Sequence, residues 1–89
     1  MRKVVADSET TGLDASIHRI INLAAIELID NLPTGRFVQF YVNPDRSSDP
    51  VALSIHGLTD EFLRDKPRFP EIADEFLAFI GADPLIIHN

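Results

Sequence analysis

The sequence has 89 residues, no cysteine and a formal net charge of −6, and 45% of its residues are hydrophobic. This length allows one small globular domain, and the lack of cysteine excludes a disulfide framework or a thiolate zinc site and favours a cytoplasmic protein. No apolar run approaches the roughly 18 residues that span a bilayer, and the negative charge argues against a broadly basic nucleic-acid-binding surface.

Two strands are predicted in the first third of the chain. Residues 3–6 form the first, followed by a turn at Gly12 and Leu13 and a loop over residues 14–18. Residues 20–29 form a long apolar run rich in β-branched side chains, which predicts a largely buried strand. A short helix is the alternative for this run, because it also contains helix-favouring leucine and alanine.

A hairpin and a short helix are expected next. Turn-forming residues over 30–35 and alternating residues over 37–42 predict a third strand that pairs with the second. Residues 43–50 are rich in proline, serine and aspartate and are predicted to form a loop. Thr59 is suited to cap a short helix over residues 60–65.

A longer helix and a fourth strand close the chain. Pro70 suits the first helical position and Gly81 the position after the helix end. One apolar stripe is expected to pack on the sheet, formed by Ile72, Ala73, Phe76, Leu77 and Ile80. Phe69, Phe76 and Phe79 are predicted to be core residues rather than a base-stacking platform. Residues 84–87 are apolar throughout, which predicts a buried, central strand with His88 at its end.

These elements predict a mixed α/β sheet. The three strands up to residue 42 run antiparallel, and the helix over 70–80 is expected to cross over and place the fourth strand parallel to the first. The end of the fourth strand should then lie beside Asp7 and Glu9, which follow the first strand.

Asp7 and Glu9 are the candidate catalytic residues. Side chains two apart on a strand point to the same side, so these two carboxylates project together from the end of the first strand. A cation between them would relieve their repulsion, and hard oxygen ligands suit Mg²⁺ or Mn²⁺. A bare D-x-E more often merely faces solvent, but the Thr-Thr-Gly-Leu that follows supplies a turn where a substrate backbone can approach.

The run from Val4 to Leu13 closely resembles the first motif of the DEDD family of 3′–5′ exonucleases. Within that family the chain is most similar to the proofreading subunits of bacterial DNA polymerase III. The resemblance covers nearly the whole chain, and its further segments are Arg19–Ile21, Glu27–Leu28, Pro33–Arg36, Tyr41–Pro44, Ile55–Leu63, Asp65–Pro67, Ile72–Phe76 and Ile86–Asn89.

The resemblance implies a ribonuclease H-like fold, cut after its fourth strand, with residues 1–89 as the N-terminal part of one exonuclease domain. It implies hydrolysis from a single-stranded 3′ DNA end with two bound Mg²⁺ or Mn²⁺ ions, and docking to the polymerase III catalytic subunit. Asp7 and Glu9 would bind metal and substrate, and Thr10, Thr11, Gly12 and His56 would bind substrate.

Other features of the sequence qualify this expectation. His88 and Asn89 match only the start of the motif that carries the third acid, so the fourth acid and the His or Tyr base are also missing, and the 89 residues alone are expected to be inactive. Family members usually carry Glu where this chain has Val51, and Glu and Gly where it has Asn22 and Ala24. For His56, a surface histidine without contacts is the alternative.

Two alternatives to an active enzyme follow, namely a catalytically dead nucleic-acid-binding module and a polymerase-docking module. The sequence leaves open which of these applies, whether the chain is a fragment or a degenerate gene product, and whether the substrate is DNA or RNA. An uncovered sheet face and a free strand edge would also favour a homodimer or a domain swap.

Overall fold

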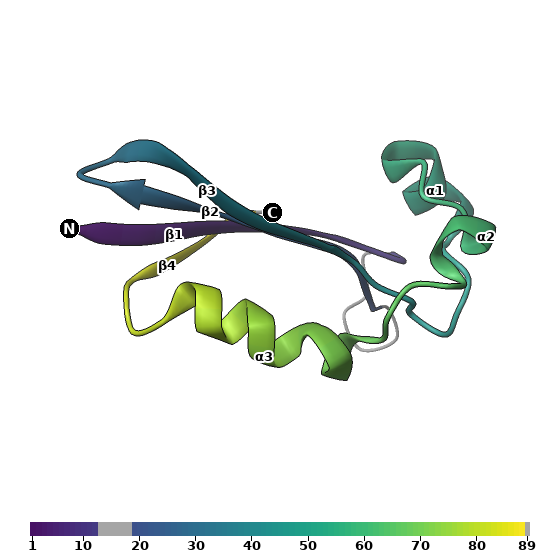
Figure 1. The fold of residues 1–89 in the computed structure, drawn as a ribbon. Coiled ribbons are helices and arrows are strands. Elements are labelled where there is room, and N and C mark those ends of the chain that lie inside the picture. Colours follow the sequence, from purple (N-terminus) through teal and green to yellow (C-terminus); the bar gives the residue numbers. More distant parts are fainter. Residues whose placement is uncertain (13–18, 89) are drawn as a thin grey trace.

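The computed structural model describes residues 1–12 and 19–88. The predicted turn residue Leu13, the predicted loop over 14–18 and Asn89 therefore lie outside the described residues. Figure 1 shows the arrangement of the described elements. In chain order they are β1 (Arg2–Thr10), β2 (Ile20–Ile29), β3 (Leu32–Tyr41), α1 (Pro50–His56), α2 (Asp60–Leu63), α3 (Phe69–Ile80) and β4 (Leu85–His88).

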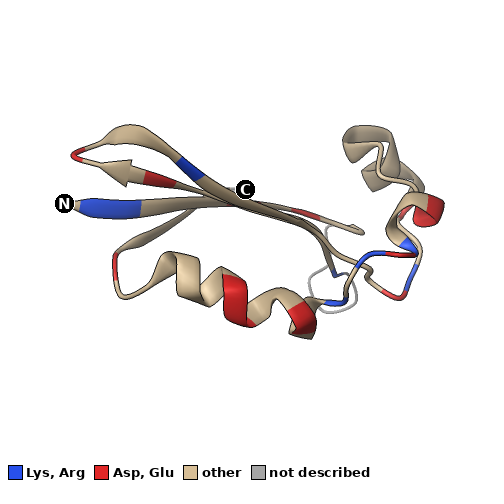
Figure 2. Cartoon of the chain, in the orientation of Figure 1, with Lys and Arg blue, Asp and Glu red and all other residues tan. Residues whose placement is uncertain are grey.

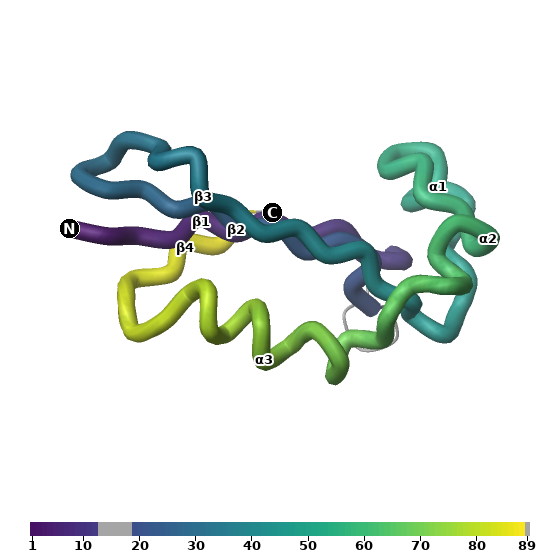
Figure 3. Tube along the Cα trace, in the orientation of Figure 1, coloured from purple at the N-terminus to yellow at the C-terminus, as the bar shows by residue number. Residues whose placement is uncertain are grey.

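The strands form one mixed sheet in the order β3-β2-β1-β4. β2 pairs antiparallel with β1 and β3, while β4 pairs parallel with β1. The predicted crossover is confirmed, because α3 connects β3 to β4 and runs along one face of the sheet (Figure 1). α1 and α2 lie together at one end of the sheet, opposite the β2–β3 hairpin (Figure 3).

Of the first three strands, β1 and β3 are longer than predicted. β2 matches the predicted span, and the alternative of a helix there is wrong. β1 continues to Thr10, so the two candidate acids lie within a strand and not beyond its end. The hairpin turn is narrower than residues 30–35, because Asp30 and Asn31 have φ of 50° and 68° and residues 32–35 already belong to β3. Such a two-residue turn with both φ positive matches the twist of the flanking strands.

α1 was not predicted, although its ends carry recognisable signals. Pro50 stands at its start, and Gly57 follows its end with a φ of 69°. α2 begins as predicted, with the Thr59 hydroxyl accepting a hydrogen bond of 3.1 Å from the Phe62 N–H, but it ends at Leu63 and not at residue 65.

α3 supplies the core on one face of the sheet. Ile80 packs with Val4, Ala6 and Ala25 of the strands. Ile72 packs in a second cluster with Leu23 and Val42, and Phe76 contacts both clusters.

The predicted stripe and the predicted aromatic core are each wrong at one residue. The Leu77 side chain is 61% exposed, because the helix turns it away from the sheet, and that of Phe69 is 42% exposed at the helix start. Phe76 and Phe79 pack against the core as expected.

β4 differs from its prediction. It pairs with β1 on one side and lies at the edge of the sheet, and all four of its residues are exposed, including His88. The prediction of a central, buried strand is therefore wrong for the described residues. A continuous apolar run is typical of a strand that is covered on both faces, whereas β4 has β1 as its only partner among the described strands.

A buried ion-pair network fastens the end of the sheet opposite α1. The Glu27 side chain is 7% exposed and accepts hydrogen bonds from Arg2 Nε at 2.6 Å, Arg36 Nη1 at 3.0 Å and the Thr34 hydroxyl at 2.7 Å. The Arg2 guanidinium also donates to the carbonyl oxygens of Phe79 and Ile80 at the C-terminus of α3. A cation at this position is favoured by the helix dipole. The network thus joins three strands to α3.

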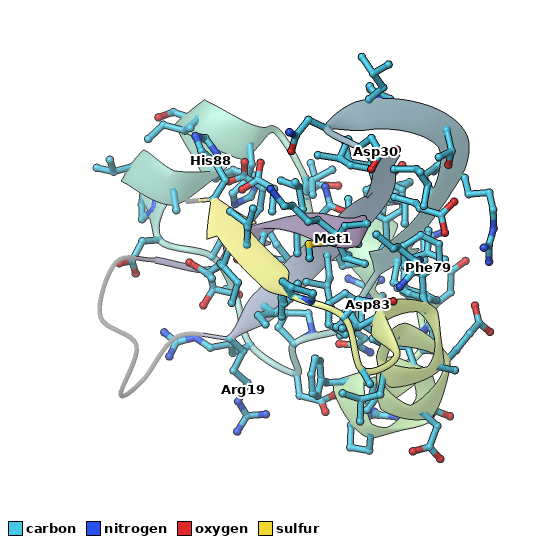
Figure 4. All side chains as sticks on the ribbon, turned by 90° about the vertical axis from the view of Figure 1, so that its left-hand side faces the viewer. Met1, Arg19, Asp30, Phe79, Asp83 and His88 are labelled. Carbon is cyan, nitrogen blue, oxygen red and sulfur yellow. The ribbon has the colours of Figure 1, made fainter. Side chains whose placement is uncertain are left out.

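Asp83 completes this network. Its carboxylate accepts a hydrogen bond of 2.9 Å from Arg2 Nη1. In Figure 4 Phe79 and Asp83 lie on the same side of the molecule, at the end of α3. Arg2 therefore also fixes the turn that leads from α3 into β4.

Stability is expected to fall at acid pH because of Glu27. The hydrogen bonds from Arg2 and Thr34, and then the charges of Arg36 and Arg2, lower the pKa of Glu27 from its ordinary value of 4.5. A depressed folded pKa stabilises the fold above the unfolded pKa, and this contribution is lost as pH falls below about 4.5 and through the folded pKa. The free energy of unfolding measured from pH 7 downward should fall less steeply for Glu27→Gln. Equal slopes for both proteins would contradict this.

Among the described residues, no helix has both the length and the apolar character needed to cross a membrane.

Candidate active site

Asp7 and Glu9 lie on the same face of β1, as predicted from their spacing. Val4 and Ala6 point into the core under α3. Because strand side chains alternate, Asp7 and Glu9 point to the opposite face of the sheet, which α3 does not cover. Asp7 is exposed and Glu9 half-buried. The two carboxylates therefore face an open surface of the sheet.

Neighbouring strands frame this carboxylate pair. In the pairing register Ala24 stands opposite Asp7 and Asn22 opposite Glu9. On the other side, His88 at the end of β4 is in register with Asp7, which confirms the prediction that the end of the fourth strand lies beside the acids. Two of the three departures from the family pattern, Asn22 and Ala24, thus fall directly beside the acids. Asn22 adds a neutral side chain there, where an acid would increase the repulsion.

Within the part of the chain that the structure describes, Asp7 and Glu9 are not joined by a third acid. Among the described residues, no ion pair joins Asp7 or Glu9 to a cation; Asp7 Oδ1 accepts a hydrogen bond of 2.9 Å from the Ser8 N–H. No group of three or more His, Cys, Asp or Glu side chains in the described part of the chain could hold a metal ion. Two carboxylate oxygens on one face are chemically suited to a divalent cation, but they hold Mg²⁺ weakly without further anionic ligands. The pair fits half of a metal site.

The turn after β1 is held by its own hydrogen bonds. The Thr10 hydroxyl donates to the Gly12 carbonyl at 2.5 Å, and the Thr11 hydroxyl accepts from the Arg19 N–H at 3.1 Å. The Thr11 side chain is fully buried. Both hydroxyls therefore fix the shape of the turn, and substrate contacts by Thr10, Thr11 and Gly12 stay a prediction.

Backbone hydrogen bonds connect this turn to α1, which the sequence did not indicate. The Thr11 carbonyl accepts from the Asp49 N–H at 2.8 Å, and the Thr11 N–H donates to the Arg19 carbonyl at 2.9 Å. Residue 49 immediately precedes α1, so the helix that carries His56 is attached to the turn that follows the acids. Backbone contacts between segments 38 residues apart leave no pattern in side-chain type, which is why no sequence signal could have found them.

His56 lies at the end of α1 with one ring nitrogen engaged. Its Nδ1 accepts a hydrogen bond of 2.9 Å from the Leu58 N–H, so the neutral ring carries its hydrogen on Nε2. Nε2 is buried and has no hydrogen-bond partner in the described part of the chain. The positive φ of Gly57 makes the turn that brings Leu58 back to the ring. A surface histidine without contacts, the alternative considered from sequence, is therefore wrong.

Comparisons with known proteins extend this picture. A family model described as Exonuclease (RNase_T) matches residues 4–89. DNA polymerase III subunit epsilon of Rickettsia conorii is 50% identical over 90 residues, which are 100% of this chain and 39% of that protein. The Escherichia coli subunit of the same name is 44% identical over 93 residues, with 99% and 38% covered. The chain thus spans about two fifths of the length of these relatives.

Solved structures agree on the fold. Exonuclease X in complex with 5′-overhanging duplex DNA superposes with a TM-score of 0.78 at 30% identity, covering 98% of this chain and 48% of that one. A product-bound exonuclease I superposes with a TM-score of 0.81 at 24% identity, covering 97% and 21%. The latter likeness concerns the fold alone, the predicted ribonuclease H-like mixed sheet. With a family model matching almost all of its length, the chain belongs to the exonuclease family.

Proposed function

We propose that this chain carries the first two carboxylates and part of the nucleotide pocket of a 3′–5′ exonuclease that proofreads DNA. The observation that carries the proposal is the placement of Asp7 and Glu9 together on the uncovered face of β1, next to the end of β4. Relatives named as subunits of DNA polymerase III support DNA as the substrate and the polymerase catalytic subunit as the partner. A cytoplasmic location is part of the same proposal.

Asp7 and Glu9 would hold divalent ions, Mg²⁺ or Mn²⁺. Such ions, when bound, lower the pKa of a coordinated water and stabilise the charge that develops on the phosphate. The negative carboxylates prevent the site from attracting a phosphodiester unaided, because their charge has the same sign. The ions and the acids are therefore required together, and the 89 residues alone are proposed to be inactive.

His56 would contact the terminal nucleotide. Its Nε2–H is a buried donor that the described residues leave unused, and an unused buried donor is unfavourable unless a ligand accepts its hydrogen bond. The bond from Leu58 fixes the ring so that this N–H, and not Nδ1, is presented. A phosphate or base oxygen would be a suitable acceptor.

The first test is an exonuclease assay on the protein made from its native gene, after its intact mass is measured. A mass of about two and a half times the 9.9 kDa of this chain, as its 39% share of a relative's length implies, would show that further residues, where the remaining acids belong, are present. On a 5′-labelled single-stranded oligonucleotide with Mg²⁺, Asp7→Asn is expected to slow removal of 3′ nucleotides on the order of 10³-fold. Asp74→Asn is the matched control, because Asp74 is an exposed acid of α3 and its loss changes the net charge equally.

Three results would contradict the proposal. Unchanged degradation by Asp7→Asn would remove the acid pair from the reaction. A native mass of 9.9 kDa without degradation, but with single-strand binding that survives Asp7→Asn together with Glu9→Gln, would favour the binding module instead. Binding to the polymerase subunit without any affinity for DNA would favour the docking module.

A further inference from the structure

Five of the eight Lys and Arg residues of this acidic chain gather at one end of the molecule. Figure 2 shows basic positions along the segment that joins α2 to α3 and in the loop before α1. These residues are Arg19, Arg46, Arg64, Lys66 and Arg68. Acidic residues lie in the same segments, namely Asp45, Asp49, Asp60, Glu61 and Asp65. The local charge is therefore decided by which of these side chains line the hollows at this end.

Two adjoining hollows lie among these residues. The first has a volume of about 430 Å³ and has Arg19, Arg68 and Phe69 in its wall. The second, of about 350 Å³, has Arg46 and Arg64 in its wall. Both include Asn43, Pro44, Asp45 and Arg68, so they form one depression. Four arginines line it against two aspartates, Asp45 and Asp60, and we call it the basic cleft.

The arginines of the basic cleft are held in place and remain accessible. Arg68 Nε donates to Asp45 at 2.7 Å, and the Arg68 side chain is 61% exposed. Arg19 Nη1 donates to the Pro44 carbonyl at 3.2 Å, which fixes one edge of its guanidinium. Arg19 also lies at the periphery of the molecule in Figure 4. Each guanidinium has five N–H donors, so one bond to the loop leaves others for a ligand.

Phe69 adds an aromatic surface beside these charges. It is the first residue of α3, its side chain is 42% exposed, and it lines the first hollow together with Pro70. An exposed ring next to arginine side chains is the combination that binds single strands, because the bases stack on the ring while the cations contact the phosphates. Acidic side chains of a peptide would match the charge, but a carboxylate has no aromatic face to stack on the ring.

The basic cleft is separate from the acid pair. Ile20, Val42 and the start of α3 line it, so it belongs to the side of the sheet that α3 covers, whereas Asp7 and Glu9 face the other side. The two are still neighbours along the chain, because Arg19 pairs with Thr11 through two hydrogen bonds. A strand with one nucleotide at the acids would have to pass around this end of the sheet to reach the cleft.

We propose that the basic cleft is a second contact site for single-stranded nucleic acid, which holds the phosphates and one base of a segment away from the 3′ end. Arg19 and Arg68 would contact phosphate oxygens, and Phe69 would stack on a base. The inference shares with the proposed function only the class of ligand, since it needs neither metal nor a free 3′ end.

A circular single strand tests this proposal, because it has no 3′ end to enter the acid site. Fluorescence anisotropy in EDTA would measure binding of a labelled dT circle and of a linear dT strand of about 12 nucleotides or more. Arg19→Gln is expected to weaken binding of the circle several-fold and to reduce the slope of log K against log salt by about 0.7. Phe69→Leu, which keeps an apolar side chain without the ring, should weaken it about tenfold.

Lys3→Gln is the matched control. It removes one positive charge at the other end of the sheet, where Lys3 bonds to Asn31, and it should leave binding of the circle nearly unchanged. Asp7→Asn should also leave it unchanged, which separates this proposal from the proposed function. Equal weakening by Arg19→Gln and Lys3→Gln, or binding of the linear strand alone, would overturn the proposal. So would binding of poly-glutamate as tight as that of dT and unaffected by Phe69→Leu, which would identify an acidic protein segment as the ligand.

Discussion

Replacing Glu27 by alanine is expected to lower the melting temperature of the chain by about 10 °C or more. The change deletes the acceptor for Arg2, Arg36 and Thr34 in one step. The Arg2 side chain is only 18% exposed, so its charge would be left largely out of water without its carboxylate partner. Breaking such a pair from one side is much more destabilising than removing an exposed charge.

The measurement is thermal unfolding followed by circular dichroism, with Glu75→Ala as the control. Glu75 is an exposed residue of α3, so the same truncation there should change the melting temperature little. If the penalty comes from the unpaired arginine, the double variant Arg2→Met with Glu27→Leu should recover part of the loss. A double variant less stable than Glu27→Ala would show instead that the ion pair itself stabilises the fold.

The Glu27 network also shows what the sequence could not indicate. Glu27 occupies a position in β2 that the apolar pattern assigns to a buried strand, and no local rule predicts a carboxylate there. Its partner Arg2 is 25 residues away in sequence. The two residues whose carbonyl oxygens Arg2 also binds, Phe79 and Ile80, are 77 and 78 residues away from Arg2. Contacts of that range depend on the packed sheet and cannot be read from spacing.

The elements that were predicted correctly have strong local signals. β2 is bounded by turn residues and rich in β-branched side chains, and α3 has proline at its start and glycine after its end. α1 has the same two signals, Pro50 and Gly57, but its seven residues are too few for an apolar period to emerge. The signals at its two ends are therefore the only indication of this helix in the sequence, and the predicted loop over residues 43–50 includes its first residue.

The candidate site also has one feature that the local sequence predicts and others that depend on how the chain packs. The spacing of Asp7 and Glu9 predicts their shared face, because alternation along a strand is a local property. The buried Nε2 of His56 depends on how α1 packs, and the basic cleft draws its arginines from three separate segments. Phe69 was predicted to be a core residue because an apolar side chain at a helix start usually packs inward, but here it is half exposed at the cleft.

Replacing Ile72 by alanine is the second change with a large expected effect, a loss of about 3 kcal/mol in the free energy of unfolding. The Ile72 side chain is 5% exposed and packs with Leu23 and Val42 between α3 and the sheet. Its truncation removes buried methyl groups and leaves a cavity between α3 and the sheet, which the strands cannot fill because their mutual hydrogen bonds fix their positions.

Leu77→Ala is the matched control on the same helix. The sequence pattern places Leu77 in the same apolar stripe, but its side chain is 61% exposed, so its truncation should change the free energy of unfolding by less than about 0.5 kcal/mol. Both free energies are measured by urea unfolding and are compared only if the dependence of the free energy on urea concentration is the same in all variants. Equal losses at the two residues would mean that Leu77 is buried against the sheet, as the sequence pattern predicts, and would contradict the orientation of α3 in the structure.

Because α3 leads directly into β4, a loosened helix would also free the strand whose His88 stands in register with Asp7. In the protein made from its native gene, slower removal of 3′ nucleotides by Ile72→Ala than by Leu77→Ala, at a temperature where both are folded, would link this packing to the acid pair.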